Sequence, residues 1–152
     1  MLVVTDLERS KAFYRETLGL EVEVDFGANV TLTGGVCLQT KESWEEFLSV
    51  TPDAITFGGR DAELYFEEAL FDAFAERLKT VASLQYVHPV MEHSWGQRVV
   101  RFYDPDQHVI EVGEPIDMVC KRFLDSGMTA AEVAKRMDVP EECIRMCEQE
   151  KS

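Results

Sequence analysis

The stretch HSWGQRVVRFYDPDQHVIEVGE, residues 93–114, decides the fold of this chain. Two mainly apolar runs, 98–103 and 108–113, predict two β-strands. The DPD sequence at 104–106 has the composition of a turn, because proline presets its backbone and aspartate accepts local hydrogen bonds. The stretch therefore predicts a hairpin with an acidic corner, and it raises the question of whether this hairpin carries a metal site.

The hairpin completes a series of elements that begins near residue 62. AELYFE (62–67) predicts a strand, EALFDAFAERLKT (68–80) a helix and LQYVHPV (84–90) another strand. Four apolar side chains fall on the predicted buried side of the helix: Leu70, Phe71, Phe74 and Leu78. The half-module of about 62–114 is thus expected to run strand, helix, strand, strand, strand.

The first part of the chain, about 1–40, predicts the same order. LVVTD (2–6) ends in Asp6, whose carboxylate can cap the helix predicted for LERSKAFYRETLGL, and Gly19 is placed to end that helix in a left-handed conformation. LEVEVDF (20–26) and NVTLTGGVCLQT (29–40) predict three further short strands, the last two joined at Gly34-Gly35.

The two predicted half-modules form an internal repeat. Phe13 and Phe74 hold matching places in the two predicted helices, 61 residues apart. A four-stranded sheet with one helix leaves one sheet face uncovered, so we expect the halves to pair. The sequence predicts an α+β fold of two βαβββ modules with curved mixed sheets around a cleft. A connector at 41–61 joins them, with one or two helical turns and a stretch that could form an edge strand.

Residues 118–152 break the repeat and predict helices alone. Thr129 and Glu132 have the spacing of a capping box. One interpretation is a helix-turn-helix, but acidic residues would begin its second helix and oppose phosphates. We favour an amphipathic helical extension, packed on the domain, a dimer seam or the cleft mouth, with these side chains inward: Phe123, Leu124, Val133, Met137 and Ile144.

Composition narrows the class of partner. The chain has 15 Lys and Arg against 29 Asp and Glu, a formal net charge of −14, which repels nucleic acids and anionic membranes. No apolar run approaches the roughly 20 residues of a membrane helix, and no leader pattern begins the sequence, so we expect a cytoplasmic protein. Cys143 and Cys147 lie four residues apart, but no further Cys or His pair completes a zinc set, and we expect reduced thiols.

Two stretches carry a family resemblance: TDLERSKAFYRETLGLEV (5–22) and WGQRVVRFYDPDQHVIEV (95–112). With the repeat between them, they resemble the vicinal-oxygen-chelate superfamily of glyoxalase I, bleomycin-resistance proteins, fosfomycin-resistance enzymes and extradiol dioxygenases. The resemblance implies that residues 1–117 form one glyoxalase-like domain, often a homodimer, whose cleft binds a small organic molecule.

The resemblance also implies where a divalent metal would bind. In metal-dependent members the ligands come from the first and last strand of each half, and here these places hold Glu111, Glu63 and Gln39, while the fourth falls before residue 1. Two carboxylates and an amide without an imidazole suit Zn, Ni or Fe poorly. We therefore expect a degenerate site and no metal cofactor, with a divalent metal as the alternative. Glu111 is alternatively a carboxylate paired with Arg98 or Arg101.

Other residues near the predicted cleft could bind a substrate. Trp95 offers a flat apolar surface, Arg98 a fork for an anion and His93 a proton acceptor near neutral pH, and Gln97 and Glu63 complete the predicted set. The alternative is that Trp95 fills the core, Arg98 pairs with a strand acid, and His88 and His93 are surface residues. Gln107 stands where the superfamily's corner usually has glycine, so it either tolerates a left-handed backbone or selects another turn.

Three functions follow from these features. The first is a small-molecule binding protein, for which the acidic charge favours a cationic ligand. The second is a metal-dependent lyase of the glyoxalase I type, with Glu111 as metal ligand or general base. The third is a ligand-sensing module in which the helical extension reports the occupancy of the cleft to a partner.

Overall fold

The structure is a computed structural model that describes residues 1–149. The chain divides into two compact units. The first unit contains Met1–Leu64, Val81–Gln85 and Phe102–Ile110. The second contains Tyr65–Thr80, Tyr86–Arg101 and the described residues from Glu111 onward.

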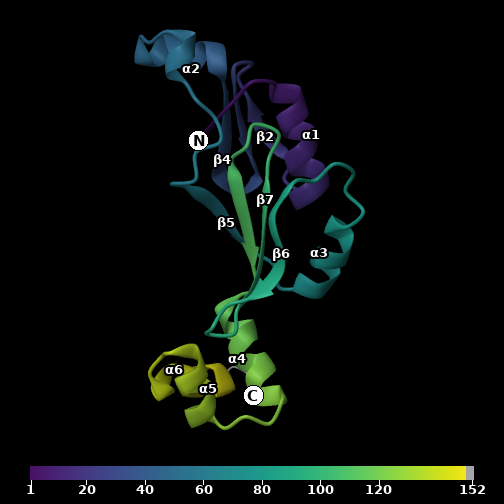
Figure 1. Ribbon diagram of the computed structural model, residues 1–152, viewed down its shortest axis with the longest axis vertical. Coiled ribbons are helices and arrows are strands. Elements are labelled where there is room, and N and C mark those ends of the chain that lie inside the picture. The colour runs from purple at the N-terminus through teal and green to yellow at the C-terminus, as the bar shows by residue number, and fades with distance from the viewer. Residues whose placement is uncertain (150–152) are drawn as a thin grey trace. The chain divides into compact units, whose positions relative to one another are not determined.

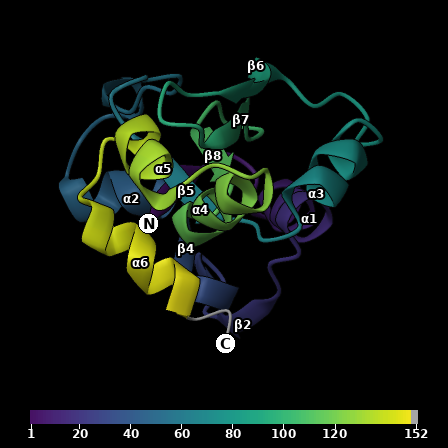
Figure 2. The same ribbon diagram turned by 90° about the horizontal axis from the view of Figure 1, so that it is seen from below.

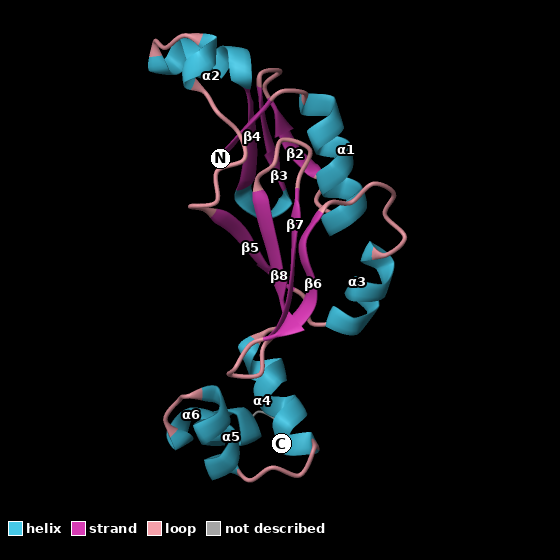
Figure 3. Ribbon diagram, viewed as in Figure 1, coloured by secondary structure: helices cyan, strands magenta, loops and turns pink. Residues whose placement is uncertain are grey.

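The elements follow the predicted order (Figure 1 and Figure 3). The strands are β1 (Leu2–Val4), β2 (Val22–Asp25), β3 (Asn29–Leu32), β4 (Val36–Thr40), β5 (Glu63–Glu67), β6 (Tyr86–Glu92), β7 (Arg98–Tyr103) and β8 (Val109–Gly113). The helices are α1 (Leu7–Leu18), α2 (Lys41–Leu48), α3 (Phe71–Leu78), α4 (Ile116–Asp125), α5 (Ala130–Met137) and α6 (Glu141–Gln149). Two four-stranded sheets, β1-β4-β3-β2 and β5-β8-β7-β6, confirm the predicted α+β class with two βαβββ modules.

Helix α1 begins and ends where the sequence predicts. The Asp6 carboxylate accepts a hydrogen bond from the Arg9 amide at 3.0 Å, and Gly19 has the left-handed φ of 71°. The backbone of Leu7 to Leu18 brings Tyr14 into the core, where its ring is fully buried. In the first sheet, β1 runs parallel to β4 and β3 antiparallel to it.

The acidic corner after β7 is held by buried hydrogen bonds within the first unit. The Asp104 carboxylate accepts from the Tyr14 hydroxyl at 2.9 Å and lies 2.8 Å from Nδ1 of His108. Burial and the neighbouring Asp104 charge raise the pKa of Tyr14, so the phenol keeps its proton and remains a donor. Gln107 keeps a left-handed φ of 69°, which answers the question posed by its place in the corner.

The connector between the modules contains α2 and a short 3-10 turn, Pro52–Ala54. Of the described residues 41–61, none forms the edge strand that the sequence allows. In the second unit, α3 buries Phe71, Phe74 and Leu78 as predicted, but the expectation for Leu70 was wrong. Leu70 lies just before the first helical residue, and its backbone is not helical. Its side chain therefore does not follow the helical period and is 73% exposed.

The last three helices share a small core of their own. Helices α5 and α6 lie against α4 (Figure 2), and the predicted capping box of Thr129 and Glu132 is present. The predicted inward side chains Phe123, Val133, Met137 and Ile144 are buried, and Leu124 packs against them. Among the described residues, no helix combines the length and apolarity that crossing a bilayer requires.

Candidate functional site

A connected group of polar and aromatic side chains lies in the second unit. We call it the polar cluster, and it consists of Tyr65 on β5, His88 on β6, His93, Trp95 and Gln97 in the β6–β7 loop, Arg101 on β7, and Glu111 on β8. Strands supply both of its charged groups, while a loop supplies most of its aromatic surface. Rigid strands that carry a loop in this way are a common basis for binding sites.

Glu111 pairs with Arg101. The Glu111 side chain is largely buried, and the guanidinium of Arg101 contacts its carboxylate directly. Nη1 of Arg101 also lies 3.2 Å from Nε2 of His88, whose Nδ1 is 2.8 Å from the Pro89 carbonyl oxygen. A neutral His88 with its proton on Nδ1 satisfies both contacts, because it donates to Pro89 and accepts from Arg101. Of the two partners that the sequence offered for Glu111, the structure selects Arg101.

The loop after β6 places an aromatic stack beside an amide. The rings of His93 and Trp95 are stacked with centroids 4.2 Å apart, and Trp95 is 37% exposed, so it does not fill the core. The Trp95 indole donates to Oε1 of Gln97 at 3.3 Å, and Nε2 of Gln97 donates to the Tyr65 hydroxyl at 3.0 Å. The loop therefore offers a flat apolar surface with a hydrogen-bonded edge.

The charge state of His93 follows from its neighbours. Burial lowers the pKa of His93 because it removes water from the charged form, and the positive charge of Arg101 lowers it further. His93 is therefore neutral at neutral pH, so it can accept a proton or a hydrogen bond from a ligand.

Gly113 makes room for this arrangement. A Cβ atom at Gly113 would lie 3.0 Å from Nε2 of Gln97 and 3.1 Å from the Tyr65 hydroxyl, closer than ordinary van der Waals contact. Glu111 and Gly113 are two residues apart on β8, so they share one face of the strand. Strand β8 thus contributes a carboxylate to the site and, at Gly113, leaves space for the side chains of Gln97 and Tyr65.

Glu114, just after β8, connects the cluster to helix α4. Its buried carboxylate accepts hydrogen bonds from Arg98 at 3.1 and 3.2 Å and from Arg122 at 3.0 and 3.1 Å. Burial raises the pKa of Glu114, but the hydrogen bonds from Arg122 and Arg98 outweigh this effect and the net shift is downward. Because Arg98 also bonds Asp72 at 2.7 Å, the structure pairs it with acids, as the alternative interpretation of Arg98 held.

The C-terminal helices hold the loop that carries Trp95. Nη2 of Arg122 donates to the Gly96 carbonyl at 2.6 Å, and Arg136 pairs with Glu92 at 3.0 Å. A Cβ atom at Gly96 would lie 2.2 Å from the Phe123 ring, and the φ of 94° also favours glycine. We call Arg122, Phe123 and Arg136 the C-terminal clamp, since they fix both ends of this loop.

The predicted metal ligands have other partners or positions. The Gln39 amide in the first unit accepts from Asn29 at 2.8 Å and donates to Ser43. Glu63 is exposed at the start of β5, and the division of the chain assigns it to the first unit.

The donor groups near Glu111 do not suit the metal that the resemblance implies. Within residues 1–149, no group of three or more His, Cys, Asp and Glu side chains could hold a metal ion. The carboxylate of Glu111 already contacts a guanidinium, whose positive charge opposes a divalent cation. These residues do not fit the divalent metal of the superfamily's enzymes.

Sequence reasoning missed Tyr65, Gly113 and the clamp residues. The strand period could have identified Tyr65 and Gly113. Tyr65 lies two residues from Glu63 and Gly113 two residues from Glu111, so each shares a strand face with a predicted site residue. No sequence pattern indicates a role at the site for Arg122 and Phe123, since they belong to an extension outside the predicted cleft.

Comparisons with known proteins place the fold. A family profile described as a glyoxalase-like domain matches residues 1–117. A protein of unknown function from Agrobacterium tumefaciens str. C58 is 38% identical, with a TM-score of 0.66 over 76% of this chain and 91% of that chain. A search of curated proteins gave no significant match.

Two further solved structures are similar at lower identity, and they support the fold alone. A glyoxalase/bleomycin resistance protein/dioxygenase from Nocardioides is 24% identical, with a TM-score of 0.61 over 74% of this chain and 78% of that chain. A lactoylglutathione lyase from Agrobacterium tumefaciens is 24% identical, with a TM-score of 0.55 over 75% and 89%.

Proposed function

The chain belongs to the glyoxalase-like domain family, and from that premise we propose that it binds a small organic molecule at the polar cluster without a metal ion. The observation that carries this proposal is the pairing of Glu111 with Arg101. A carboxylate in this pair orients the guanidinium, and the guanidinium keeps the carboxylate from acting as a metal ligand.

The ligand has a flat part and a polar edge. The stacked rings of His93 and Trp95 suit a planar group, and the hydrogen-bonded Gln97 and Tyr65 suit a molecule that can replace or extend those bonds. The net charge of −14 favours a cationic ligand by raising its local concentration, and aromatic rings also attract cations.

The experiment that tests binding uses planar probes of opposite charge. In a Trp44→Phe variant of the full chain, Trp95 is the remaining tryptophan and its fluorescence reports on the cluster. N-methylquinolinium, a planar cation, should quench Trp95 in a saturable way, and naphthalene-2-sulfonate, a planar anion of similar size, should quench it more weakly. Gln97→Ala should weaken the quenching. Equal linear quenching by both probes would count against the proposal.

A metal-dependent lyase of the glyoxalase I type is the alternative, and metal analysis separates the two. The proposal expects less than 0.1 equivalent of Ni²⁺ or Zn²⁺ after dialysis, roughly the level of nonspecific binding. Stoichiometric metal that is lost in Glu111→Ala would support the lyase and overturn the binding protein. The catalytic role predicted for Glu111 stays a prediction.

A ligand-sensing role is a second candidate, and the C-terminal clamp favours it. Arg122 and Arg136 contact the ends of the loop that carries His93, Trp95 and Gln97. A ligand that moves this loop would change these contacts, and a partner bound to α5 or α6 would experience the change. Hydrogen exchange in α5, measured with and without N-methylquinolinium, tests this coupling.

The proposal includes a homodimer and a cytoplasmic location, with no nucleic-acid or membrane partner. The edge strand β2 and the residue after it expose Val22, Val24 and Phe26, which a second copy could cover. The four free cysteines support a reducing compartment. Light scattering of the full chain tests the dimer, and a purely monomeric protein at about 100 µM, a concentration well above typical dimer Kd values, would contradict it.

A further inference from the structure

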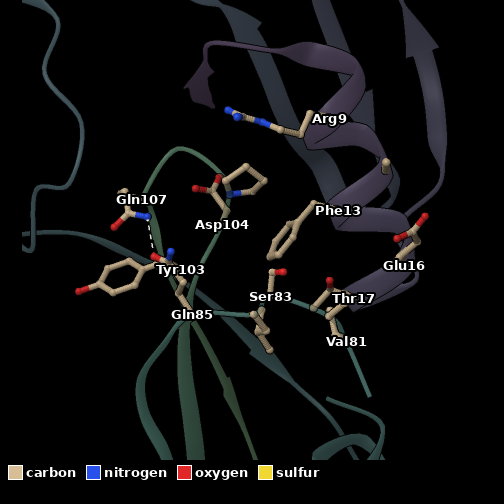
Figure 4. Close-up of a pocket in the computed structure, with 14 residues that line it drawn as sticks. Arg9, Phe13, Glu16, Thr17, Val81, Ser83, Gln85, Tyr103, Asp104 and Gln107 are labelled. Carbon is tan, nitrogen blue, oxygen red and sulfur yellow. Dashed lines mark hydrogen bonds between the residues drawn. The ribbon is translucent and has the colours of Figure 1, made fainter. Parts of the chain in front are cut away.

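A cavity of about 410 Å³ lies within the first unit (Figure 4). Its walls are α1, the segment 81–85 before β6, and the corner between β7 and β8. This volume falls in the range of small-molecule sites, roughly 300–1,000 Å³. The polar cluster belongs to the second unit and shares no residue with this cavity, so the inference about the cavity does not rest on the function proposed above.

Charged groups in the cavity wall already have partners. Arg9 pairs with Asp106 at 3.2 Å. Asp104 accepts from the Tyr14 hydroxyl and contacts His108. A charged ligand would have to compete with these contacts, whereas an uncharged ligand would leave them in place.

Neutral polar groups of the wall retain hydrogen-bonding capacity. Oγ1 of Thr17 is buried and has no hydrogen-bond partner in the described part of the chain. Nε2 of Gln107 donates to Oε1 of Gln85 at 3.1 Å, the contact dashed in Figure 4. This bond does not use the Oε1 acceptor of Gln107 or the Nε2 donors of Gln85, so two neighbouring amides of the wall can offer an acceptor and a donor to a ligand.

An aromatic ring supplies an apolar surface in the same cavity. Phe13 projects from α1 toward Ser83 on the opposite wall (Figure 4). Val81 and Leu84 add aliphatic surface. A planar ligand could lie against the Phe13 ring, which would add stacking to the burial of apolar area.

Two wall residues adopt a conformation that usually belongs to glycine. Gln107 has a φ of 69° and Ser83 a φ of 64°. Glycine would remove the conformational cost at the Gln107 position, but it would also remove the amide from the wall. Strain that is retained where a side chain enters a cavity points to a function for that side chain.

We propose that this cavity binds an uncharged planar heterocycle with a donor beside an acceptor, of the class of a nucleobase or nucleoside. The heterocycle stacks on Phe13, its polar edge meets the amides of Gln85 and Gln107, and Thr17 accepts or donates one further hydrogen bond. The exposed Glu16 carboxylate and the net charge of −14 repel a phosphate, so the ligand is a nucleoside and not a nucleotide.

The test is a saturation-transfer NMR titration of the full chain with adenosine, uridine, AMP and ribose. At least one nucleoside should bind, adenosine should bind more tightly than AMP, and ribose alone should not bind. Gln107→Gly should weaken nucleoside binding about tenfold while raising Tm by roughly 2 °C, because the variant loses hydrogen bonds to the ligand but gains backbone freedom at a left-handed position. Thr17→Val should weaken binding about fivefold.

Ser49→Gly is the matched control, since Ser49 also has a left-handed φ, of 55°, but does not line the cavity. It should raise Tm by a similar amount without changing nucleoside affinity. The proposal is overturned if neither nucleoside binds at about 10 mM, a concentration that would still detect a Kd near 1 mM or weaker. Affinity unchanged in both Gln107→Gly and Thr17→Val, or AMP binding as tightly as adenosine, overturns it equally.

Discussion

Arg101 on β7 and Glu111 on β8 form an ion pair across neighbouring strands, and the same guanidinium lies 3.2 Å from Nε2 of His88. Arg101 therefore contacts both of the other groups and restrains their positions. A largely buried ion pair contributes little net stability compared with apolar residues, but it leaves a costly charge when one partner is removed. This asymmetry makes the pair a sensitive test of the site.

Replacing Arg101 with methionine should destabilise the protein by about 3 kcal/mol, because the Glu111 carboxylate stays buried without its cation. Urea unfolding at pH 7 measures this change. The double variant Arg101→Met/Glu111→Gln is the control, and it should recover stability to within about 1 kcal/mol of the wild type. Equal losses in the single and double variants would show that Arg101 acts by packing and not through its charge.

Replacing Gly96 with alanine should cost about 3 kcal/mol of stability, because the new Cβ meets the Phe123 ring and the φ of 94° strains an L-residue. Gly127 offers a matched control, since it has the same φ but no atom within 4 Å of the added Cβ. Gly127→Ala should cost about 1 kcal/mol, the backbone part alone. If the two variants unfold at the same urea concentration, Phe123 does not pack on the loop.

The pH dependence of stability should reflect His93. Its pKa is lowered in the folded protein by burial and by the charge of Arg101, so the unfolded chain binds the proton more readily. The stability that the neutral ring contributes is present above the unfolded pKa of about 6.5 and is lost as the pH falls below it. His93→Gln should flatten the fall in Tm between about pH 7 and pH 5, whereas His108→Gln should leave this His93 contribution in place. A His93→Gln profile parallel to the wild type would contradict this assignment.

Removing the clamp should loosen the Trp95 loop. Arg122→Met deletes the hydrogen bonds to Gly96 and Glu114, so the amides of residues 93–97 should exchange at least tenfold faster with solvent. Arg145→Met is the control, because the pair of Arg145 with Glu141 on α6 is largely exposed and such pairs contribute little. Unchanged exchange in Arg122→Met would remove the basis for coupling between the extension and the cluster.

The sequence by itself determined the elements and their order. Asp6, Gly19 and the capping box of Thr129 and Glu132 act within one helical turn, so their roles are local and readable from spacing. The repeat around Phe13 and Phe74, together with the acidic corner, was sufficient to predict two βαβββ modules. Leu70 was wrongly assigned to the buried side of α3 because the helix begins one residue later, at Phe71. Sequence patterns predict the buried face of a helix better than its first residue.

The tertiary structure decided which side chains meet. Periodicity placed Glu111 on one face of a strand, but both Arg98 and Arg101 were available to it, and the pairing of neighbouring strands gave Arg101 to Glu111 and Arg98 to Glu114. The contact of Phe123 with Gly96 joins residues from a loop and a distant helix, which no local pattern encodes. Residue spacing predicts short-range geometry, whereas contacts between strands and helices depend on how the whole chain packs. The chemistry of this site depends on such long-range contacts.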